Sequence, residues 1–289
     1  MEVHVRAQVI HFVEGAGGTR LAVRAAGNPA NPPIVFVHGW ARSGADWQAQ
    51  LTAPELTSRY HLLAVDLRGH GLSGVPDTGY DDPHAWAGDL AAVLALAGRP
   101  AVLVGSSYGG LVITDYLRVT GEAGVAALLL AGALTEIGAG NPGGATGPLM
   151  GAGIRDYLAE DPAVAVPALT RLAAGLTAEP APGDVVQRRL GEFLLVPPRV
   201  RRALFRRVVT SADVLASVTV PTLIVHGTED AVVHPTAAEY AAGKIPGASL
   251  RWCDRVGHLP FAERVAEFNT ALRELADRQP GRTRRGEPR

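Results

Sequence analysis

Short apolar runs recur along the chain, and stretches with helical patterning separate them. The runs are Ile34–Val37, Leu62–Val65, Ala101–Val104 and Ala126–Leu130, and strands are expected again at Thr222–Val225 and Ser249–Trp252. Runs that are apolar on both faces are typical of strands in a parallel sheet covered by helices. The intervening stretches Asp46–Leu56, His84–Ala97 and Ser107–Thr120 predict helices. The alternation therefore predicts an α/β fold with a doubly wound, mostly parallel sheet.

The beginning, the middle and the end of the chain do not follow this alternation of strands and helices. Val3–Phe12 and Thr19–Ala26 flank a Gly-rich segment and predict an antiparallel hairpin. Between about Leu134 and Val218 the strands stop and Ala, Leu and Arg become frequent, which predicts a helical insertion. We expect a core domain of residues 1–134 and 219–277 with a last helix at Pro260–Asp277, an insertion of residues 135–218, and a disordered Arg-rich tail of residues 278–289.

Composition narrows the class of protein. The chain has 289 residues, of which 47% are hydrophobic and 19% charged, so a folded globular protein is expected. A net charge of -1 gives no general attraction to nucleic acid or to an anionic membrane. The single cysteine, Cys253, excludes an intramolecular disulfide and a Cys-rich zinc site.

Neither a signal peptide nor a membrane span is expected. The first six residues alternate polar and apolar side chains, whereas a signal peptide needs a basic start followed by an apolar run. The longest apolar run, Val125–Ala133, is far shorter than the roughly 20 residues that span a bilayer. We therefore expect a cytoplasmic protein that acts on a small molecule, without nucleic-acid or membrane partners.

The segment Gly105-Ser106-Ser107-Tyr108-Gly109 follows a predicted strand and opens a predicted helix. A G-x-S-x-G turn in this strand-turn-helix context is the arrangement of a nucleophile elbow, with Ser107 at its tip. Small residues are needed there because the backbone is strained and the neighbouring chain passes close by. Because short Gly-containing turns also occur in many other α/β proteins, this motif needs support from its surroundings.

Three further segments supply that support. His38-Gly39-Trp40, Asp230 and His258 each follow a predicted strand, and the carboxyl ends of parallel strands are where ligands bind in open α/β sheets. A serine hydroxyl is a poor nucleophile that needs a base to take its proton and a carboxylate to orient that base. Ser107, His258 and Asp230 have these roles available, and the loop at Trp40 can direct a backbone N–H at a reacting carbonyl oxygen.

Together these motifs make the chain resemble the α/β-hydrolase superfamily over nearly its whole length. The matching segments are residues 38–40, Asp66-Leu67-Arg68-Gly69-His70-Gly71-Leu72-Ser73, residues 105–109, His226-Gly227-Thr228-Glu229-Asp230 and Gly257-His258. The resemblance is to a branch that includes esterases, cofactor-free haloperoxidases and epoxide hydrolases. It implies an oxyanion hole formed by the backbone N–H groups of Trp40 and Tyr108, and a lid formed by the insertion. Epoxide hydrolases and haloalkane dehalogenases of this branch use an aspartate nucleophile, so a serine at position 107 argues against both of those reactions.

Other interpretations of the same residues stay open. Glu229 competes with Asp230 as the acid, and Cys253 lies near His258 in sequence, although a structural role for this cysteine is favoured. His38 is expected to shape the loop before Trp40 rather than to act in catalysis. His70, His84, His226 and His234 lack a compact set of ligands, so we expect no metal. In the absence of a G-x-G-x-x-G turn or a P-loop in a strand-to-helix position, we also expect no cofactor.

The insertion gives the only indication of the substrate. Its apolar residues, among them Met150, Tyr157 and Phe193, are predicted to line a pocket together with His38, which favours an apolar acyl or aromatic substrate. Seven Arg lie between Arg188 and Arg207, and a solvated helix face is the favoured interpretation over an anion-binding pocket.

The function predicted is a serine hydrolase that cleaves a carboxylic ester, thioester or lactone through an acyl-enzyme. Two alternatives remain, because fold and triad do not fix the reaction. In the first alternative, the same triad catalyses the reaction of a lyase, a C–C hydrolase, a cofactor-free oxygenase or a perhydrolase. In the second, the chain is a ligand-binding or signalling protein that has kept the fold.

Overall fold

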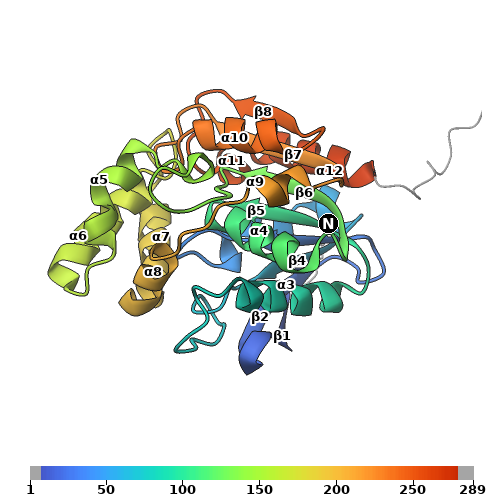
Figure 1. Cartoon of the computed structure of the whole chain (residues 1–289), viewed down its shortest axis with the longest axis horizontal. Helices are drawn as coiled ribbons and strands as arrows, with labels where there is room; N and C mark the ends of the chain where they lie inside the picture. The colour runs from blue at the N-terminus through green and yellow to red at the C-terminus, as the bar shows by residue number, and fades with distance from the viewer. Residues whose placement is uncertain (1–7, 279–289) are drawn as a thin grey trace, which may run out of the picture.

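In the computed structural model the described residues, 8–278, are built around one eight-stranded sheet of order β1-β2-β4-β3-β5-β6-β7-β8 (Figure 1). The strands are β1 (Val9–Glu14), β2 (Arg20–Ala26), β3 (Pro33–Val37), β4 (His61–Val65), β5 (Ala101–Ser106), β6 (Val125–Ala131), β7 (Thr222–Gly227) and β8 (Ser249–Cys253). β1 and β2 pair antiparallel, as does β2 with β4, and the remaining pairs are parallel. The predicted doubly wound, mostly parallel sheet is therefore confirmed.

The central strands are buried on both faces, as their uninterrupted apolar sequences predict. Val37 pairs with Gly105, Gly105 with Leu130, and Ala131 with Val225. This register brings the carboxyl ends of β3, β5, β6 and β7 to one edge of the sheet. The loops that carry the predicted site residues all leave from this edge.

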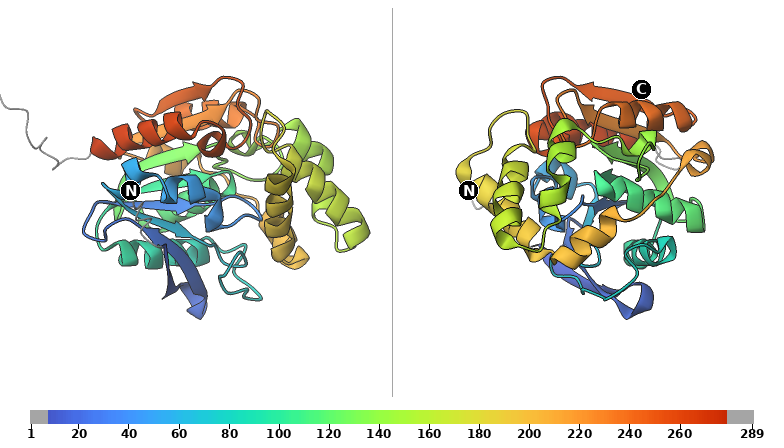
Figure 2. Two further views of the ribbon diagram at one scale, coloured as in Figure 1. Left: turned by 180° about the vertical axis from the view of Figure 1, so that it is seen from behind. Right: turned by 60° about the vertical axis from the view of Figure 1, so that its left-hand side comes forward.

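Helices pack against the sheet in two groups (Figures 1 and 2). One group, in front in Figure 1, contains α3 (Pro83–Ala97), α4 (Tyr108–Thr120), α9 (Ala212–Ala216) and α10 (Thr236–Lys244). The other, in front when the molecule is seen from behind, contains α1 (Gln48–Leu51), α11 (Pro260–Glu263) and α12 (Val265–Asp277). The short helix α2 (Pro54–Thr57) precedes β4, and the 3₁₀ turns η1 (Ala16–Gly18), η2 (Gly44–Trp47) and η3 (Pro142–Gly144) lie in loops.

Two predicted helices are interrupted in the structure. The helix expected at Asp46–Leu56 is divided into η2, α1 and α2, because Ala53 is extended and Pro54 begins a new helix. The helix expected at Pro260–Asp277 breaks at Arg264, whose φ of -131° is not helical. Helical segments lie at both predicted positions, but the prediction of one continuous helix was wrong in each case.

The segment between β6 and β7 is helical and extends over one side of the molecule, which faces the viewer in the right-hand view of Figure 2. Besides α9 it contains α5 (Pro148–Tyr157), α6 (Pro162–Ala174), α7 (Gly183–Leu195) and α8 (Pro198–Phe205). Helix α6 packs against both α5 and α7. These helices lie within residues 135–218, and their assignment to a separate insertion stays a prediction.

Two sequence predictions concern residues outside the described range. Residues 3–7 of the expected first strand and residues 279–289 of the expected disordered tail are not among the described residues. Within residues 8–278, none of the helices is long and apolar enough to cross a membrane.

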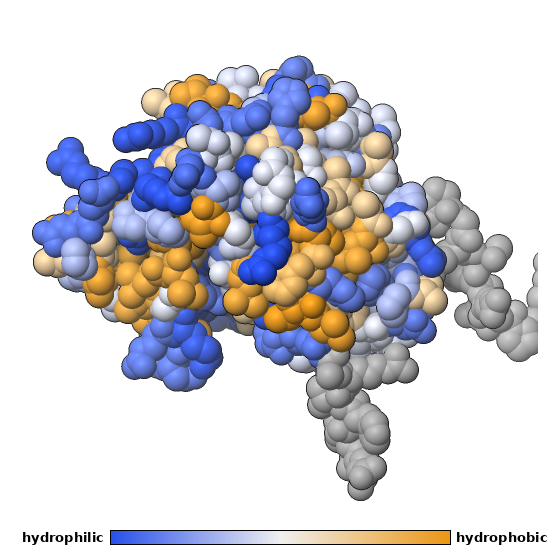
Figure 3. All heavy atoms as spheres, turned by 90° about the horizontal axis from the view of Figure 1, so that it is seen from below, coloured by the Kyte–Doolittle hydropathy of each residue, from blue (hydrophilic) through white to orange (hydrophobic). Residues whose placement is uncertain are grey.

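Some apolar side chains remain on the surface. On the face shown in Figure 3 they gather at the left, over the helices between β6 and β7, and near the centre. Exposed apolar residues include Val9, Ile10 and Phe12 of β1 and Leu194 and Leu195 of α7. We assign them no function, because apolar atoms are a normal part of protein surfaces.

Candidate active site

Ser107 lies in the sharp turn between β5 and α4. Its φ of 52° and ψ of -123° are strained for a residue with a side chain, a conformation typical of functional positions. Serine at a helix N-cap commonly accepts a hydrogen bond from the first turn, yet the Ser107 side chain makes no such bond. A Cβ on Gly39 would lie 2.9 Å from the Ser107 Cβ, so only glycine lets the loop after β3 approach this closely. The Ser107 hydroxyl is therefore free for another role.

His258 and Asp230 form a buried pair beside this turn. The His258 Nδ1 lies 2.8 Å from Asp230 Oδ2, and both residues are less than 5% exposed. Because an ionised carboxylate only accepts, Nδ1–H is the donor, which leaves the other ring nitrogen, Nε2, outside this pair. The other oxygen, Oδ1, accepts the N–H groups of Val232 and Val233 at 2.8 and 2.9 Å. Asp230 is thus oriented by backbone and in turn orients His258.

His226 is a second imidazole on the same carboxylate, and sequence reasoning missed this role. Its Nε2 lies 3.2 Å from Asp230 Oδ2 and 3.1 Å from the Val233 carbonyl oxygen, and the residue is fully buried. Burial by itself raises the pKa of Asp230, but the nearby His258 and His226 more than offset this and hold that pKa well below its ordinary value. The four-residue spacing from His226 to Asp230 was the available signal, but the only individual role considered for His226 was that of a metal ligand.

Ser107 and His258 line the same cavity, together with Gly39 and Trp40. Among the hydrogen bonds of residues 8–278, none joins the Ser107 hydroxyl to His258, and neither Ser107 Oγ nor His258 Nε2 is among the buried atoms left without a partner. Both atoms therefore reach the cavity. Hydrogen bonds between a nucleophile and its base are often long in unliganded enzymes and shorten when substrate binds.

Two backbone N–H groups beside Ser107 are candidate donors to an oxyanion. Within the described chain, neither the Trp40 nor the Tyr108 N–H donates a hydrogen bond. Trp40 is fixed by its side chain, whose Nε1 donates to the Arg201 carbonyl oxygen at 3.2 Å. The Tyr108 hydroxyl accepts from Arg207 Nη1 at 3.1 Å, and Arg207 also forms a 2.6 Å buried ion pair with Asp115. Both residues are therefore anchored to helix α8 or to the residues that follow it.

Two neutral histidines hold the loop that contains Trp40. His70 Nε2 accepts the Ala41 N–H at 3.3 Å, and His38 Nε2 accepts the Leu67 N–H at 3.0 Å. Burial lowers the pKa of His38 to about 4 and that of His70 to about 3, so both rings are neutral at pH 7 and keep these acceptors. Ala41 has a φ of 54°, a left-handed conformation that this loop imposes.

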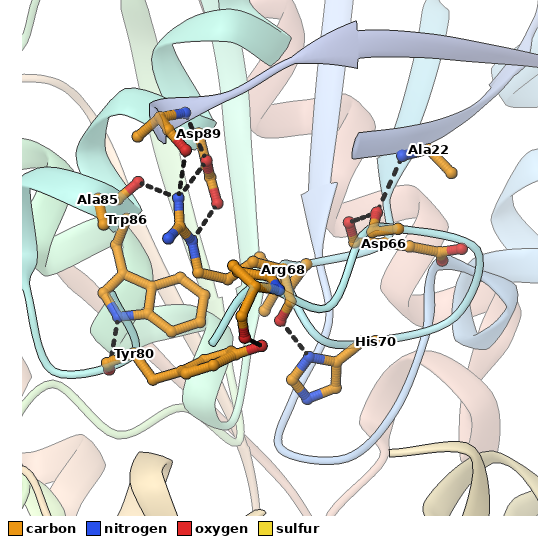
Figure 4. Close-up of polar contacts among 12 residues, drawn as sticks. Ala22, Asp66, Arg68, His70, Tyr80, Ala85, Trp86 and Asp89 are labelled. Atoms are coloured by element: carbon orange, nitrogen blue, oxygen red, sulfur yellow. Dashed lines mark hydrogen bonds and ion pairs between the residues drawn. The ribbon is translucent and has the colours of Figure 1, made fainter. Parts of the chain in front are cut away.

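Polar contacts hold the loop that begins at Asp66 (Figure 4). Asp66 Oδ1 accepts the Gly44 N–H at 2.6 Å and its Oδ2 accepts the Leu72 N–H at 2.9 Å. Arg68 makes two hydrogen bonds of 2.7 Å to Asp89 of α3, and the His70 Nδ1 lies 2.8 Å from the Arg68 carbonyl oxygen (Figure 4). These contacts tie the loop to η2 and to α3.

The predicted pocket residues fall into two groups. Met150 and Phe193 line the cavity at Ser107, along with Leu172 and Leu176. His38 is fully buried beneath the loop, and the Tyr157 hydroxyl donates to the Leu149 carbonyl oxygen inside the helical segment. Neither His38 nor Tyr157 is among the residues that line this cavity.

The Arg-rich segment is held mainly by individual contacts. Arg188 pairs with Asp184, Arg199 with Asp77, Arg202 with Glu160, and Arg207 with Asp115. These contacts favour structural roles for these four arginines over a shared anion pocket.

Glu263 is a further residue that the sequence did not reveal. Its carboxylate accepts the N–H groups of Gly257 at 3.0 Å and Leu259 at 3.3 Å, on either side of His258. It also accepts the Ala178 N–H at 2.9 Å, beyond the end of α6. The His258 loop is thus tied to the helical segment, which a carboxylate five residues after a histidine does not by itself indicate.

Comparison with known proteins places this geometry in a family. The model of the alpha/beta hydrolase family matches residues 34–271, and the chain therefore belongs to that family. An esterase of Rhodococcus sp. ECU1013 is similar in structure, with a TM-score of 0.89 and 40% identity over 93% of this chain and 99% of that one. A putative aryl esterase from Burkholderia cenocepacia has a TM-score of 0.83 and 30% identity over 93% of this chain and 100% of that one.

A relative named as a haloperoxidase rather than an esterase is also similar, over a shorter region. A non-heme haloperoxidase of Rhodococcus erythropolis is 39% identical over 128 residues, which is 44% of this chain and 45% of that protein. The alignment thus spans less than half of that relative's length. The resemblance to esterases and haloperoxidases, the fold and the assignment to an enzyme family are confirmed.

Proposed function

We propose that this protein is a serine hydrolase that cleaves a carboxylic ester, with thioesters and lactones as related substrates, through an acyl-enzyme. The observation that carries the proposal is the placement of two reactive groups on one cavity. The strained, uncapped hydroxyl of Ser107 opens on it, as does His258, whose other ring nitrogen is bonded to a buried carboxylate. The similarity to esterases supports the same class of substrate.

In this mechanism Ser107 Oγ attacks the ester carbonyl carbon while His258 Nε2 takes the hydroxyl proton. Asp230 holds the Nδ1–H tautomer and stabilises the imidazolium that forms. The N–H groups of Trp40 and Tyr108 stabilise the oxyanion, and each such donor is worth on the order of 3 kcal/mol. His258 then gives its proton to the leaving alcohol, and water activated by the same ring hydrolyses the acyl-enzyme.

Helices α5 to α8 serve as a lid in this proposal, because Met150, Leu172 and Phe193 cover the cavity from that segment. Their apolar side chains favour an apolar acyl or alcohol group. A small-molecule substrate and a cytoplasmic location, without nucleic-acid or membrane partners, complete the proposal.

The test is a panel of esters of graded acyl length, assayed with the wild-type protein and with Ser107→Ala. Turnover that Ser107→Ala reduces by about 10³-fold or more, with the circular dichroism spectrum unchanged, supports the proposal. Equal turnover by both proteins would refute it.

The similarity to a haloperoxidase favours a second candidate reaction at the same residues. Hydrogen peroxide would replace water in attacking the acyl-enzyme, releasing a peracid. Peracid formation from an ester and hydrogen peroxide, dependent on Ser107 and faster than acid formation, would support this reaction over hydrolysis.

A further inference from the structure

The cavity at Ser107 is small. Its volume is about 20 Å³. A single water needs roughly 10–15 Å³, so this cavity holds little more than one water. An ester bound with its carbonyl carbon at Ser107 therefore extends beyond the cavity.

A much larger groove lies next to this cavity. Its volume is about 450 Å³, and Arg42, Asp46 and Leu259 line both spaces. Leu259 directly follows His258, the residue that protonates the leaving alcohol in the proposed mechanism. The groove therefore lies beside the loop that carries this histidine.

Arg42 and Asp46, which line both spaces, belong to a buried charge cluster that joins the core to helix α7, and the α7 member of this cluster, Glu192, lines the groove. Arg42 bonds Asp46 through both Nε and Nη2, and both side chains are less than a tenth exposed. Arg42 Nη1 also lies 3.0 Å from Glu192 Oε2 of α7, and the Ser43 hydroxyl donates to Glu192 Oε1 at 3.3 Å. Arg42 additionally stacks over the ring of Phe193, which lines the cavity.

Glu192 is the weaker side of this cluster. Arg42 Nη1 and Glu192 Oε2 are buried but do not meet hydrogen-bond geometry, whereas the contact with Asp46 is bidentate. The Glu192 side chain is 21% exposed, against 6% for Asp46. Burial also raises the pKa of Glu192 to about 7, although Arg42 opposes this. A large share of the Glu192 carboxyl is therefore neutral at pH 7, which weakens its attraction to Arg42. Glu192 can therefore leave Arg42 more easily than Asp46 can.

From this geometry we propose that the Arg42–Glu192 ion pair is a displaceable partition that determines substrate length, and that the groove behind it binds the alkyl chain of the ester's alcohol. This inference rests on the proposed function. The apolar lining of the groove, Val185, Leu259, Phe261 and Ala262, suits an alkyl chain. Of the arginines in its lining, Arg188 is paired with Asp184 and Arg42 with two carboxylates, while Arg189 donates to the Ala173 carbonyl oxygen at 3.1 Å.

The experiment compares kcat/KM for ethyl acetate, hexyl acetate and ethyl hexanoate in five proteins. These are the wild type, Glu192→Ala, which removes the ion pair, Ala262→Trp, which fills the groove from an exposed position, Glu160→Ala, and Ser107→Ala as the inactive reference. Glu160→Ala is the matched control, because it also removes a carboxylate paired with an arginine of the helical segment, Arg202, but away from the groove.

We expect Glu192→Ala to raise the hexyl-to-ethyl ratio about ten-fold and Ala262→Trp to lower it by a similar factor, with Glu160→Ala at the wild-type ratio. A ratio within about two-fold of wild type in both groove variants would overturn the inference. So would a change seen only when the acyl chain, rather than the alcohol, is lengthened. If neither ester shows Ser107-dependent turnover, the proposed function falls and this inference with it, whereas turnover with unchanged ratios overturns the inference alone.

Discussion

The neutral His70 beneath the Trp40 loop predicts a specific dependence of stability on pH. Its pKa is about 3 in the folded protein, because the ring is buried, against 6.5 for an exposed histidine. As pH falls below 6.5 the unfolded chain binds a proton at this position and the folded chain does not. The stability is therefore fully present above pH 6.5 and is lost progressively as pH falls toward 3.

The size of this effect follows from the linkage between proton binding and unfolding. Between pH 7 and pH 5, one histidine that stays neutral only in the folded state lowers the free energy of unfolding by about 2 kcal/mol. His38, with a pKa of about 4, adds a similar loss. Glu192 acts in the opposite direction, because its pKa is raised to about 7 and the folded protein binds the proton first.

The variant His70→Gln isolates the contribution of His70, since glutamine keeps an acceptor but does not titrate in this range. Urea unfolding of both proteins at pH 7, 6 and 5 should show the wild type losing about 2 kcal/mol more than the variant. The comparison uses the change with pH in each protein, so a lower overall stability of the variant does not affect it. Equal pH dependence in the two proteins would refute a neutral, buried His70.

Three substitutions test other parts of the structure. Asp230→Asn should lower kcat on the order of 10⁴-fold with little change in folding, because asparagine does not hold the Nδ1–H tautomer of His258; steady-state kinetics showing a loss under ten-fold would contradict this role. Gly132→Ala should both destabilise the protein and lower kcat/KM, since Gly132 has a φ of 51° and an added Cβ would lie 2.8 Å from the His258 carbonyl oxygen. Thermal unfolding and kinetics unchanged from wild type would be inconsistent with that close approach. Arg207→Met leaves Asp115 buried without its partner and should cost about 3–5 kcal/mol in urea unfolding, and adding Asp115→Leu should recover part of the loss; a single variant as stable as wild type would contradict the importance of the pair.

The fold was predictable because its sequence signals are local. Strands such as β3 and β5 are continuous apolar runs, and the elbow at Ser107 has small neighbours that any strand-to-helix turn of this kind requires. The break at Ala53 was missed although Pro54 disfavours a helical conformation at the residue before it, whereas the break at Arg264 has no such signal in the sequence.

The supporting residues of the site were harder to predict, because some partners lie far away in sequence and others are backbone groups that no side-chain pattern marks. Glu263 binds backbone groups at Gly257, Leu259 and Ala178, and Glu192 meets Arg42 across 150 positions of the chain. His226 was visible in the sequence, but only its proximity to Asp230 in the structure identifies it as a partner of that carboxylate. Tyr157 was expected in the pocket from its aromatic character, whereas its hydroxyl satisfies a carbonyl within the helical segment.

The central claim is that Ser107 is an activated nucleophile, and covalent labelling tests it most directly. The protein is treated with a fluorophosphonate, which reacts with activated serines, and the modified peptide is identified by mass spectrometry. The account predicts one modification per chain, on Ser107, that is lost in Ser107→Ala and strongly slowed in His258→Ala. Labelling at another residue, or no labelling of the folded wild-type protein, would contradict the account.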